Sequence, residues 1–521
     1  MQKRIQARAI GELFTFLYQS SADIQLLNYF LEKCDELDAP AQLISSTAGM
    51  AISLGENEEA LRLFSVLIER HPLEVSAQQQ VGVKAFILGK YELAEMIWTR
   101  CSVHREALII KLGLDKLKVR FLAPSWYLAI GHIAHLDIYL KHKILNGRAD
   151  HRTYFSLPAG MELPNNNLMS YWSDHISHVD KDTLKNLSPT EIGILQDEFW
   201  SIPFEDGKSR MFSHAGSLVQ HRWEAEDRAP LLNIKPADRL RGEATLRQLG
   251  VPVGSWFVCL HVREPGFHLK WHKSHPGTRN ADIFTYLPAA REVVARGGYV
   301  IRLGDASMRP LPNEQGIIDY ALSKAKSEFM DVFLCGACRF FIGTNSGLGL
   351  VPPIFGVPCA MTNWSPIGLP QWYPNDIYIP KLLYSERLGR NLTFEEMLFS
   401  EAGWSQFEKY LIKSGLQTID NTPEELTELV LEMLDRVNGE VAITENDQKL
   451  RKTFNDRVLR ADSYIGAQLG MGFLRRHQEL LATSTDFSKM KGLLRGSSSQ
   501  SRSHSEPFVV EQHMEKKEAF L

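Results

Sequence analysis

Short apolar runs separated by polar or turn segments dominate the middle of this chain. Between residues 256 and 361 they read WFVCLHV, YVIRL, MDVFL, RFFIG and VPCAM, each with several apolar positions in a row. Continuous apolar runs of this length are typical of strands buried on both faces of a parallel sheet. The pattern predicts strands at these five places, and an α/β domain over residues 251–420.

A second pattern of the same kind comes earlier in the chain. KVRFLA near residue 120 and RTYFSL at residues 152–157 predict two strands, with helical spacing of apolar residues between them. A further helix is expected at NNLMSYWSDHI, residues 166–176. Strand, glycine-containing loop, helix and strand form a βαβ unit. We therefore expect a separate α/β domain over residues 106–250.

Residues 1–105 have a helical pattern throughout. The segments LGENEEALRLF and LGKYELAEMIW, which begin at Leu54 and Leu88, align at a spacing of 34 residues. This period resembles tetratricopeptide repeats, in which small residues let paired helices approach closely. The small residues that correspond here are Gly55 with Gly89 and Ala60 with Ala94. Two interpretations stay open: an array that docks a protein partner, or a helical cap on the next domain.

The end of the chain divides into helices and a polar tail. TPEELTELVLEMLDRV is strongly amphipathic, and Thr422 and Glu425 have the spacing of a capping box. We expect helices over residues 421–488 that pack on the α/β domains. Residues 489–521 contain GSSSQSRSHSEP, a composition that predicts disorder.

Composition narrows the function classes. With 44% apolar residues among 521, the chain can build large cores, and its net charge of -4 argues against bulk electrostatic binding of nucleic acid. The six cysteines lie mostly in apolar runs and predict reduced core residues. Cys335 and Cys338 form a CxxC pair without the second pair that zinc requires.

No membrane span is expected. The N-terminal residues lack the apolar core of a signal peptide, and the most apolar window, residues 121–140, contains Pro124, His132, His135 and Asp137. We expect a cytoplasmic protein with at most peripheral association with the inner membrane.

Polar residues follow the predicted strands of the second α/β domain, where such sheets bind ligands. His261 and Arg263 follow the first strand, and the planar fork of an arginine suits a diphosphate. The next loop adds positive charge that either contacts the ligand or is solvated, from Lys270, His272, Lys273 and Arg279. Arg302 and Asp305 flank the end of the next strand, where Arg302 either binds the diphosphate or pairs with Asp305 to brace the sheet.

A turn after RFFIG is the most specific signal. Thr344, Asn345, Ser346 and Gly347 offer hydroxyl, amide and backbone donors at the start of a helical segment, an arrangement that holds phosphate or ribose oxygens. Pro352 and Pro353 require this helix to be short or to start late.

His132 is the candidate acceptor-side residue. It follows Gly131 at the first strand-to-helix junction of the earlier domain, where a substrate would lie. It is either a base or a helix-start histidine with a local hydrogen bond, whereas His135 is expected to pack.

Several motifs are missing from the sequence. It contains neither a P-loop nor a GxGxxG fingerprint nor a nucleophile elbow. His261, His268, His272 and His275 cluster without regular ligand spacing. We therefore expect no metal and no cofactor beyond the substrates.

Together, these features resemble bacterial GT-B glycosyltransferases of surface-polysaccharide loci. The segment GTNSGLGLVPPIFGVP is similar to the donor site of heptosyltransferases, and His261-Val262-Arg263 resembles the HxR motif of fucosyltransferases, whose arginine contacts the GDP diphosphate. The second arginine of that motif is Glu264 here. The resemblance implies two Rossmann-like domains facing a cleft, after tetratricopeptide-like repeats.

The implied activity is transfer of a sugar from a nucleotide-sugar to a glycan, lipid-linked or protein acceptor. His132 and Asp305 are then the candidate bases. His261, Arg263, Arg302 and the turn of Thr344, Asn345, Ser346 and Gly347 would bind the donor. Two alternatives stay open: another polysaccharide-modifying transfer, such as pyruvyl transfer, or a non-catalytic repeat scaffold with a degenerate transferase body.

Overall fold

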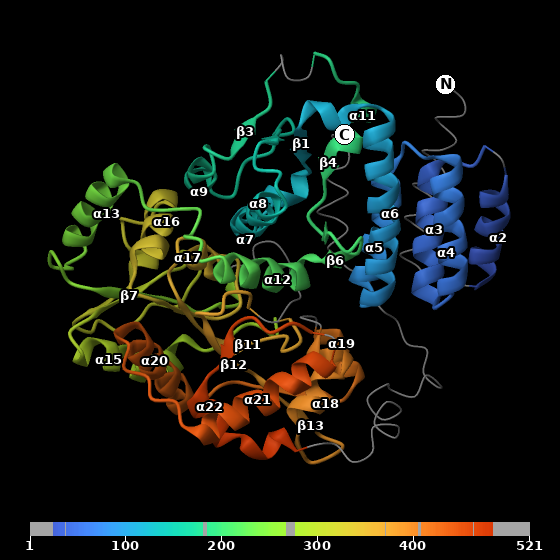
Figure 1. Ribbon diagram of the computed structural model, residues 1–521. Helices are drawn as coiled ribbons and strands as arrows, with labels where there is room; N and C mark the ends of the chain where they lie inside the picture. Colours follow the sequence, from blue (N-terminus) through green and yellow to red (C-terminus); the bar gives the residue numbers. More distant parts are fainter. Residues whose placement is uncertain are drawn as a thin grey trace.

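The computed structural model describes residues 24–482, except residues 37, 181–184, 267–276, 370, 405–407 and 462. Residues 1–23 of the predicted helical region and the predicted disordered tail, residues 489–521, lie outside this part. An all-helical region comes first, followed by two regions built on separate parallel sheets (Figure 1). This order confirms the predicted α/β fold class. Among the described residues, no helix has the length and apolar character needed to cross a bilayer.

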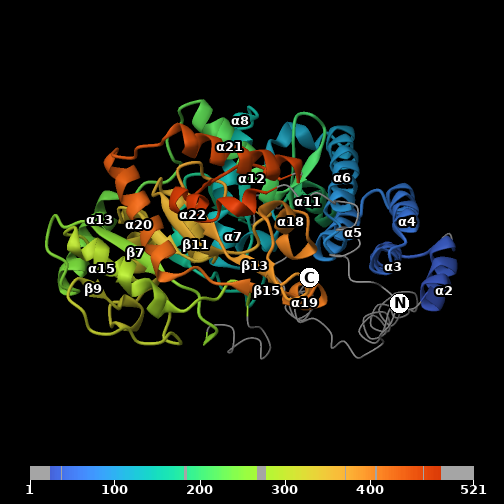
Figure 2. The same ribbon diagram turned by 90° about the horizontal axis from the view of Figure 1, so that it is seen from below.

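The helical region consists of antiparallel hairpins stacked beside the first sheet (Figures 1 and 2). Its helices are α2 (Ile24–Asp35), α3 (Ala41–Leu54), α4 (Asn57–Arg70), α5 (Val75–Ile87) and α6 (Tyr91–Lys111). The 34-residue spacing aligns the turns after α3 and α5. Gly55 and Gly89 both have positive φ there, at 90° and 74°.

The structure corrects the expected role of these glycines. Beyond the local backbone, no atom of the described residues lies within 4 Å of a Cβ added at Gly55 or Gly89, so these glycines end helices in the left-handed conformation and create no close approach. Close packing occurs instead at Gly82, where an added Cβ would lie 2.4 Å from the indole nitrogen of Trp98. Ala60 and Ala94 are fully buried, as their position in a helix interface requires.

The first sheet has the strand order β3-β2-β1-β4, with every pairing parallel. Its strands are β1 (Val119–Leu122), β2 (Arg152–Phe155), β3 (Ile176–His178) and β4 (Gln196–Asp197). The helices are η1 (Leu114–Leu117), η2 (Pro124–Tyr127), α7 (Ile130–Ala134), α8 (Leu136–Leu145), α9 (Asn166–Tyr171) and α11 (Pro189–Leu195). The predicted helix over residues 166–176 is shorter than expected, because its last residue, Ile176, begins β3.

A connecting segment leads from the first sheet to the second. It contains a hairpin of β5 (Ser201–Pro203) and β6 (Ser209–Met211), then α12 (Phe212–Ala225) and α13 (Pro236–Gln248). Helix α12 packs on α8, and α13 packs on the second α/β region.

The second sheet has the order β16-β12-β11-β10-β7-β8-β9, again with parallel pairings. Its strands are β7 (Phe257–His261), β8 (Tyr299–Arg302), β9 (Ile317–Ile318), β10 (Phe341–Gly343), β11 (Cys359–Trp364), β12 (Ile377–Pro380) and β16 (Gln468–Leu469). Four of the five predicted strands are confirmed as β7, β8, β10 and β11.

The fifth predicted strand is wrong. MDVFL lies inside helix α16 (Glu328–Ala337), where the side chain of Ser327 accepts a hydrogen bond from the amide of Met330 and caps the helix. Phe329 and Phe333, one turn apart, are both buried. A short apolar run satisfies a buried helix as well as a buried strand.

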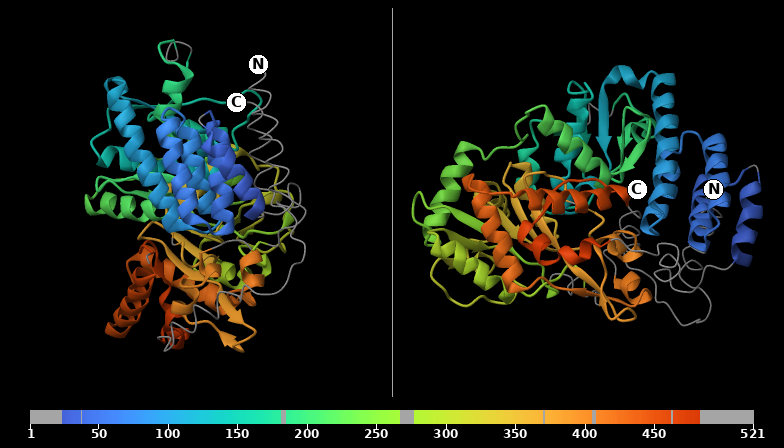
Figure 3. Two further views of the ribbon diagram at one scale, coloured as in Figure 1. Left: turned by 90° about the vertical axis from the view of Figure 1, so that its right-hand side faces the viewer. Right: turned by 60° about the horizontal axis from the view of Figure 1, so that its bottom comes forward.

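The remaining elements close the second region. They are η3 (Ile283–Tyr286), α15 (Leu287–Ala295), η4 (Tyr320–Leu322), η5 (Leu348–Leu350), α17 (Val351–Ile354), β13 (Leu382–Ser385), β14 (Arg390–Asn391), α18 (Phe394–Leu398), η6 (Glu401–Gly403), α19 (Glu408–Lys413), β15 (Leu416–Ile419), α20 (Pro423–Asn438), α21 (Glu445–Arg460), α22 (Met471–Arg476) and η7 (Gln478–Leu481). The predicted capping box is confirmed, because Thr422 and Glu425 each bond the other's backbone at the start of α20. Helix α20 packs on α15 and on strands β11 and β12 (Figure 3).

The carboxyl edges of the two sheets face each other, as expected for the GT-B fold class. Helix α7, which follows β1, meets the turn after β10 so closely that a Cβ added at Gly131 would lie 2.9 Å from the Cα of Gly347. Nearby, the Tyr373 hydroxyl donates a 2.9 Å hydrogen bond to Asp137 of α8. The two α/β regions are therefore in direct contact beside the candidate site.

Candidate functional site

The predicted donor residues gather at the carboxyl edge of the second sheet. Strands β7, β8 and β10 are neighbours in parallel register, with Gly343 opposite His261 and Leu260 opposite Arg302. Parallel strands end at the same edge, so the residues that follow each strand meet there. A backbone hydrogen bond joins the end of β10 to the end of β7, because the amide of Thr344 donates to the carbonyl of His261 at 3.1 Å.

The turn after β10 is held by its own side chains. Thr344 is fully buried, and its hydroxyl accepts a 2.9 Å hydrogen bond from the amide of Arg263. The side-chain amide of Asn345 donates to the carbonyl of Ser365 at 2.9 Å. Thr344 and Asn345 therefore brace the turn, and the prediction that the Thr344 hydroxyl holds a phosphate does not fit its burial.

Ser346 is positioned by a histidine. Its hydroxyl lies 3.1 Å from Nδ1 of His261, and burial lowers the pKa of His261 to about 4, with the charge of Arg302 adding to the effect. The imidazole is therefore neutral at pH 7. His261 lies beneath Ser346, so its part in the site is to orient that hydroxyl.

The helix expected after this turn is short, as the two prolines predict. After the turn, η5 is followed by α17, which spans only four residues. So short a helix contributes little dipole, and the predicted anion binding at a helix start loses this source of positive potential. Positive charge at the site must come from side chains.

Arg263 and Arg279 supply that charge. An added Cβ at Gly277 would lie 3.6 Å from Nη2 of Arg263, and the amide of Ala281 donates to the Arg263 carbonyl at 3.1 Å, so the segment carrying Arg279 lies against Arg263. Burial lowers the pKa of Arg263 to about 10. Burial, with the charge of Arg263, lowers the pKa of Arg279 to about 9.

Neither guanidinium group has an acidic partner or a hydrogen-bond acceptor among the described residues, and burial and mutual repulsion alone shift their pKa values. Beside them, the side-chain oxygen of Asn280 is buried without a donor in the same part of the chain. Two partly buried cations that repel each other cost stability unless an anion joins them. The arrangement is suited to a ligand with two or more negative charges.

Arg302 is not part of this pair. It is fully buried, and it donates to Asp319 at 2.7 Å, to Glu264 at 3.1 Å and to the carbonyl of Arg309 at 3.0 Å. The predicted diphosphate contact of Arg302 is therefore wrong. Bracing was the alternative, but the partners are Glu264 and Asp319 and not Asp305.

Glu264 explains the departure from the fucosyltransferase motif. This carboxylate is 4% exposed and joins Arg302 to Arg309, whose Nε lies 2.6 Å from Oε1. A second arginine at position 264 would face Arg302 across the same space. Asp305 accepts a 2.7 Å hydrogen bond from the amide of Ser307 in the turn after β8, at the same sheet edge.

His132 lies on α7 in the first α/β region, across the contact between the two regions from the predicted donor residues. Its Nδ1 is 2.6 Å from the carbonyl oxygen of Ser125, and its ring stacks on Phe199 with centroids 4.2 Å apart. A carbonyl can only accept, so Nδ1 carries the proton and Nε2 keeps its lone pair. Burial lowers the pKa of His132, which leaves the imidazole neutral at pH 7.

His135 packs, as expected, in an aromatic cluster. Its ring lies 4.9 Å from Phe212 and 4.6 Å from Trp372, which belongs to the second region.

The structure thus brings together His261, Arg263 and the 344–347 turn, and places Gly131 and His132 at the facing edge. Arg279, predicted only as a charge on a loop, lies next to Arg263 in the structure. Asn280, beside this pair, was not predicted as a site residue. Lys270, His272 and Lys273 lie outside the described residues. Among the described residues, no group of three or more His, Cys, Asp or Glu side chains is placed to hold a metal ion. All six cysteines are free and buried.

Comparisons with known proteins give weak similarity to glycosyltransferases. A glycosyl transferase family 9 protein from Veillonella parvula DSM 2008 aligns with a TM-score of 0.32 and 11% identity, over 50% of this chain and 85% of that chain. The ADP-heptose lps heptosyltransferase II of E. coli aligns with a TM-score of 0.37 and 14% identity, over 61% and 99%. The iron-containing dodecameric glycosyltransferase TibC from enterotoxigenic E. coli H10407 gives 0.32 and 10%, over 62% and 77%.

No protein-family model matches this sequence, and no curated protein matches it.

Proposed function

We propose that this protein is a glycosyltransferase that moves a sugar from a nucleotide-sugar to a glycan, lipid-linked or protein acceptor in surface-polysaccharide biosynthesis. The observation that carries the proposal is the pair Arg263 and Arg279 at the carboxyl edge of a parallel sheet, for which the described residues supply no anionic partner. A nucleoside diphosphate supplies the charge that this pair lacks. The motif resemblance at His261-Val262-Arg263 and at the 344–347 turn supports the same assignment.

In this proposal the donor lies on the second α/β region. Arg263 and Arg279 stabilise the diphosphate as negative charge develops on it during loss of the sugar, a contribution that is large in a site that excludes water. Two fixed cations do this without a metal ion. When Nδ1 of His261 carries the proton, the Ser346 hydroxyl accepts from the imidazole and can donate its own hydrogen to the nucleotide-sugar.

The acceptor would approach from the first α/β region. His132 is the proposed base, because its protonated Nδ1 is fixed on Ser125 and its Nε2 is free to take the proton of an acceptor hydroxyl. Asp305, on the donor side, is the second candidate. The contact between Gly131 and Gly347 brings the acceptor side and the donor side together.

Release of nucleotide from UDP-, GDP-, ADP- and CMP-linked sugars tests this function. We expect turnover of one donor by the full chain, unaffected by EDTA. Arg263→Ala should reduce kcat/KM roughly 10- to 100-fold, as expected when a charge-assisted hydrogen bond is lost. His132→Gln should lower kcat with little change in donor affinity.

Arg247→Ala is the matched control, because this exposed arginine lies on α13 away from the sheet edge. A folded protein that turns over none of the four donors would contradict the proposal. Consumption of phosphoenolpyruvate in their place would identify pyruvyl transfer, and binding of protein partners without any turnover would favour the scaffold.

A further inference from the structure

A surface of exposed apolar and basic side chains lies at the end of α6, where the chain turns toward the first sheet. It consists of residues 110–118, with the sequence IKLGLDKLK, and residues 148–152, with the sequence RADHR. The two segments are adjacent, because the amide of Arg152 donates to the carbonyl of Lys118 at 2.8 Å and the side chains of Lys118 and Asp150 form an ion pair. We call these two segments the α6–β1 surface.

Three large apolar side chains of this surface face solvent. Ile110, Leu112 and Leu117 are 68%, 46% and 44% exposed. Their neighbours Ile109 and Leu114 are almost completely buried, so these two positions pack the segment against the fold and the other three do not. Single exposed apolar residues are common, but three within eight residues form a cluster that is typical of an interaction surface.

Basic side chains surround the apolar ones. In the sequence, Lys111 separates Ile110 from Leu112, and Leu117 lies between Lys116 and Lys118. The exposed charged residues of the α6–β1 surface are Lys111, Lys116, Lys118, Arg148, Arg152, Asp115 and Asp150. Five cations and two carboxylates leave a surplus of three positive charges, in a chain whose net charge is -4. The surface therefore attracts anions locally.

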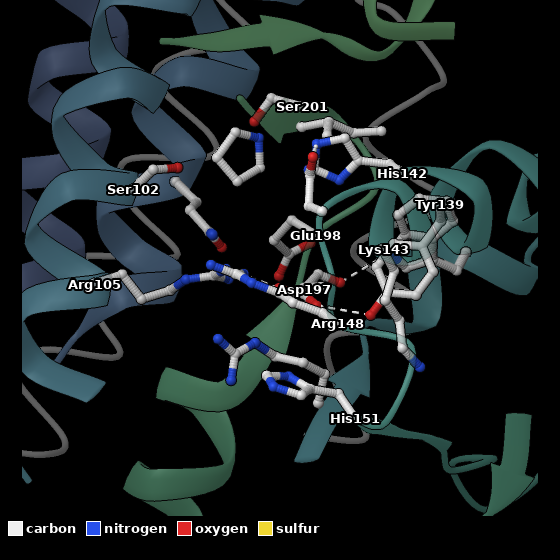
Figure 4. Close-up of a pocket in the computed structure, with 16 residues that line it drawn as sticks. Ser102, Arg105, Tyr139, His142, Lys143, Arg148, His151, Asp197, Glu198 and Ser201 are labelled. Atoms are coloured by element: carbon white, nitrogen blue, oxygen red, sulfur yellow. Dashed lines mark hydrogen bonds and ion pairs between the residues drawn. The ribbon is translucent and has the colours of Figure 1, made fainter. Parts of the chain in front are cut away.

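The cations beneath this surface differ from those on it. Arg105 of α6 is buried and extends toward Asp197, with 2.8 Å between Nη2 and Oδ1 (Figure 4). This pair is balanced within the fold. Lys111, Lys116 and Arg148 are exposed, and none of them forms an ion pair with a described residue. The charges of these three side chains are available to an external anion.

The α6–β1 surface lies away from the proposed donor site. Lys118 directly precedes β1, and Arg152 is the first residue of β2. The surface is therefore at the amino edge of the first sheet, whereas the carboxyl edge faces the second sheet (Figure 1). A partner bound here does not obstruct the contact between the two α/β regions.

An anionic lipid bilayer supplies both kinds of contact that this surface needs. At the boundary of a bilayer, apolar side chains enter the acyl region while lysines and arginines contact the phosphate groups of the lipids. A protein partner needs a continuous apolar centre from which charged groups are excluded. Each exposed apolar residue of residues 110–118 has a lysine beside it in the sequence, an arrangement that fits the bilayer and not the protein partner.

We propose that the α6–β1 surface attaches this protein to an anionic lipid bilayer. Ile110, Leu112 and Leu117 enter the bilayer at the level of the headgroups, and the surrounding lysines and arginines contact the lipid phosphates. Such attachment is peripheral, and it weakens as the salt concentration rises. It does not require the proposed sugar transfer, so either one can fail while the other holds.

Sedimentation of the full chain with lipid vesicles tests the proposal. We expect binding at low salt to vesicles made of equal parts phosphatidylcholine and phosphatidylglycerol, and much weaker binding to phosphatidylcholine alone. Lys111→Gln and Lys116→Gln should each weaken binding about fivefold, the effect of losing one cation near an anionic membrane. The double variant Leu112→Glu/Leu117→Glu should not bind, because two negative charges replace the inserting side chains.

Two substitutions on α13 are the matched controls. Arg247 and Leu240 are exposed there, on the other side of the molecule from α6 (Figures 1 and 2). Arg247→Gln and Leu240→Glu should therefore bind vesicles as wild type does. All the substituted side chains are exposed, so thermal midpoints equal to that of wild type would establish that every variant is folded.

A fluorescent label identifies which surface meets the lipid. All six native cysteines are buried, so a label sensitive to polarity can be attached selectively at Leu112→Cys or at Leu240→Cys. Mixed vesicles should shift the emission of the first label to shorter wavelengths and leave the second unchanged. No binding to either kind of vesicle, equal binding to both, binding that survives the substitutions at the α6–β1 surface, or an equal shift of the two labels would each overturn the proposal.

Discussion

Two groups of arginines at one sheet edge differ in what balances their charge. Arg302, at the end of β8, is fully buried between Glu264 and Asp319 and donates to both. Arg263 and Arg279, after the neighbouring strand β7, are partly exposed and have no acceptor among the described residues. The charge of Arg302 is balanced within the fold, whereas no described residue balances the charges of Arg263 and Arg279.

This difference distinguishes an arginine that stabilises the fold from arginines that are suited to bind a ligand. A buried cation with its own carboxylates is part of the core, and removing it leaves charges without partners. A pair of cations held together without carboxylates raises the energy of the folded protein, and an anionic ligand lowers it. We therefore propose that an anionic ligand binds at Arg263 and Arg279.

Substitution of Arg302 gives the largest expected effect. Arg302→Met removes the cation between Glu264 and Asp319, and the loss of one partner of a buried ion pair costs about 3–5 kcal/mol of unfolding free energy. Urea unfolding measures this cost. Arg291→Met, at an exposed pair with Glu314, is the control and should change stability little. Equal stability of the two variants would contradict the bracing role.

Pyrophosphate should stabilise the protein through the other arginines. At 100 times its dissociation constant, a ligand that binds only the folded state adds about 2.7 kcal/mol. We expect a higher thermal midpoint with pyrophosphate in wild type and in Arg247→Ala. The double variant Arg263→Ala/Arg279→Ala should show no such rise, and an equal rise in all three would place the anion elsewhere.

The pH dependence of stability gives the smallest effect. Burial and the charge of Arg263 lower the pKa of Arg279 to about 9 in the folded protein, below its usual value, so its charged form destabilises the fold. The destabilisation is complete below pH 9 and decreases as the pH rises through that value. Arg279→Gln should therefore be more stable than wild type at pH 7, by a margin that narrows between pH 9 and 10. Urea midpoints of the two proteins at each pH measure this difference in stability. A difference that grows between pH 9 and 10 would contradict the account.

Much of the fold follows from local sequence patterns. The apolar runs locate β7, β8, β10 and β11, and the capping box locates the start of α20. The run MDVFL could not be assigned in this way, because its length suits either a buried strand or the buried helix α16 that it forms. Gly55 and Gly89 were found by spacing, but their helix-ending role depends on their φ angles.

The site depends on contacts that are distant in sequence. Arg302 and Arg263 both follow or end a strand, and only the partners of Arg302, 17 and 38 residues away, show that it is a brace. Arg279 lies in a segment without periodic pattern that the fold returns to the end of β7. Thr344 appears as a donor in the sequence, whereas its burial makes it an acceptor for the backbone of Arg263.

Titration of the protein with UDP, GDP, ADP and CMP tests the central claim most directly. The account predicts saturable binding of one nucleotide, weakened roughly 10- to 100-fold in both Arg263→Ala and Arg279→Ala and unchanged in Arg247→Ala. Binding that survives the loss of both Arg263 and Arg279, or no binding of any nucleotide by the folded protein, would contradict it.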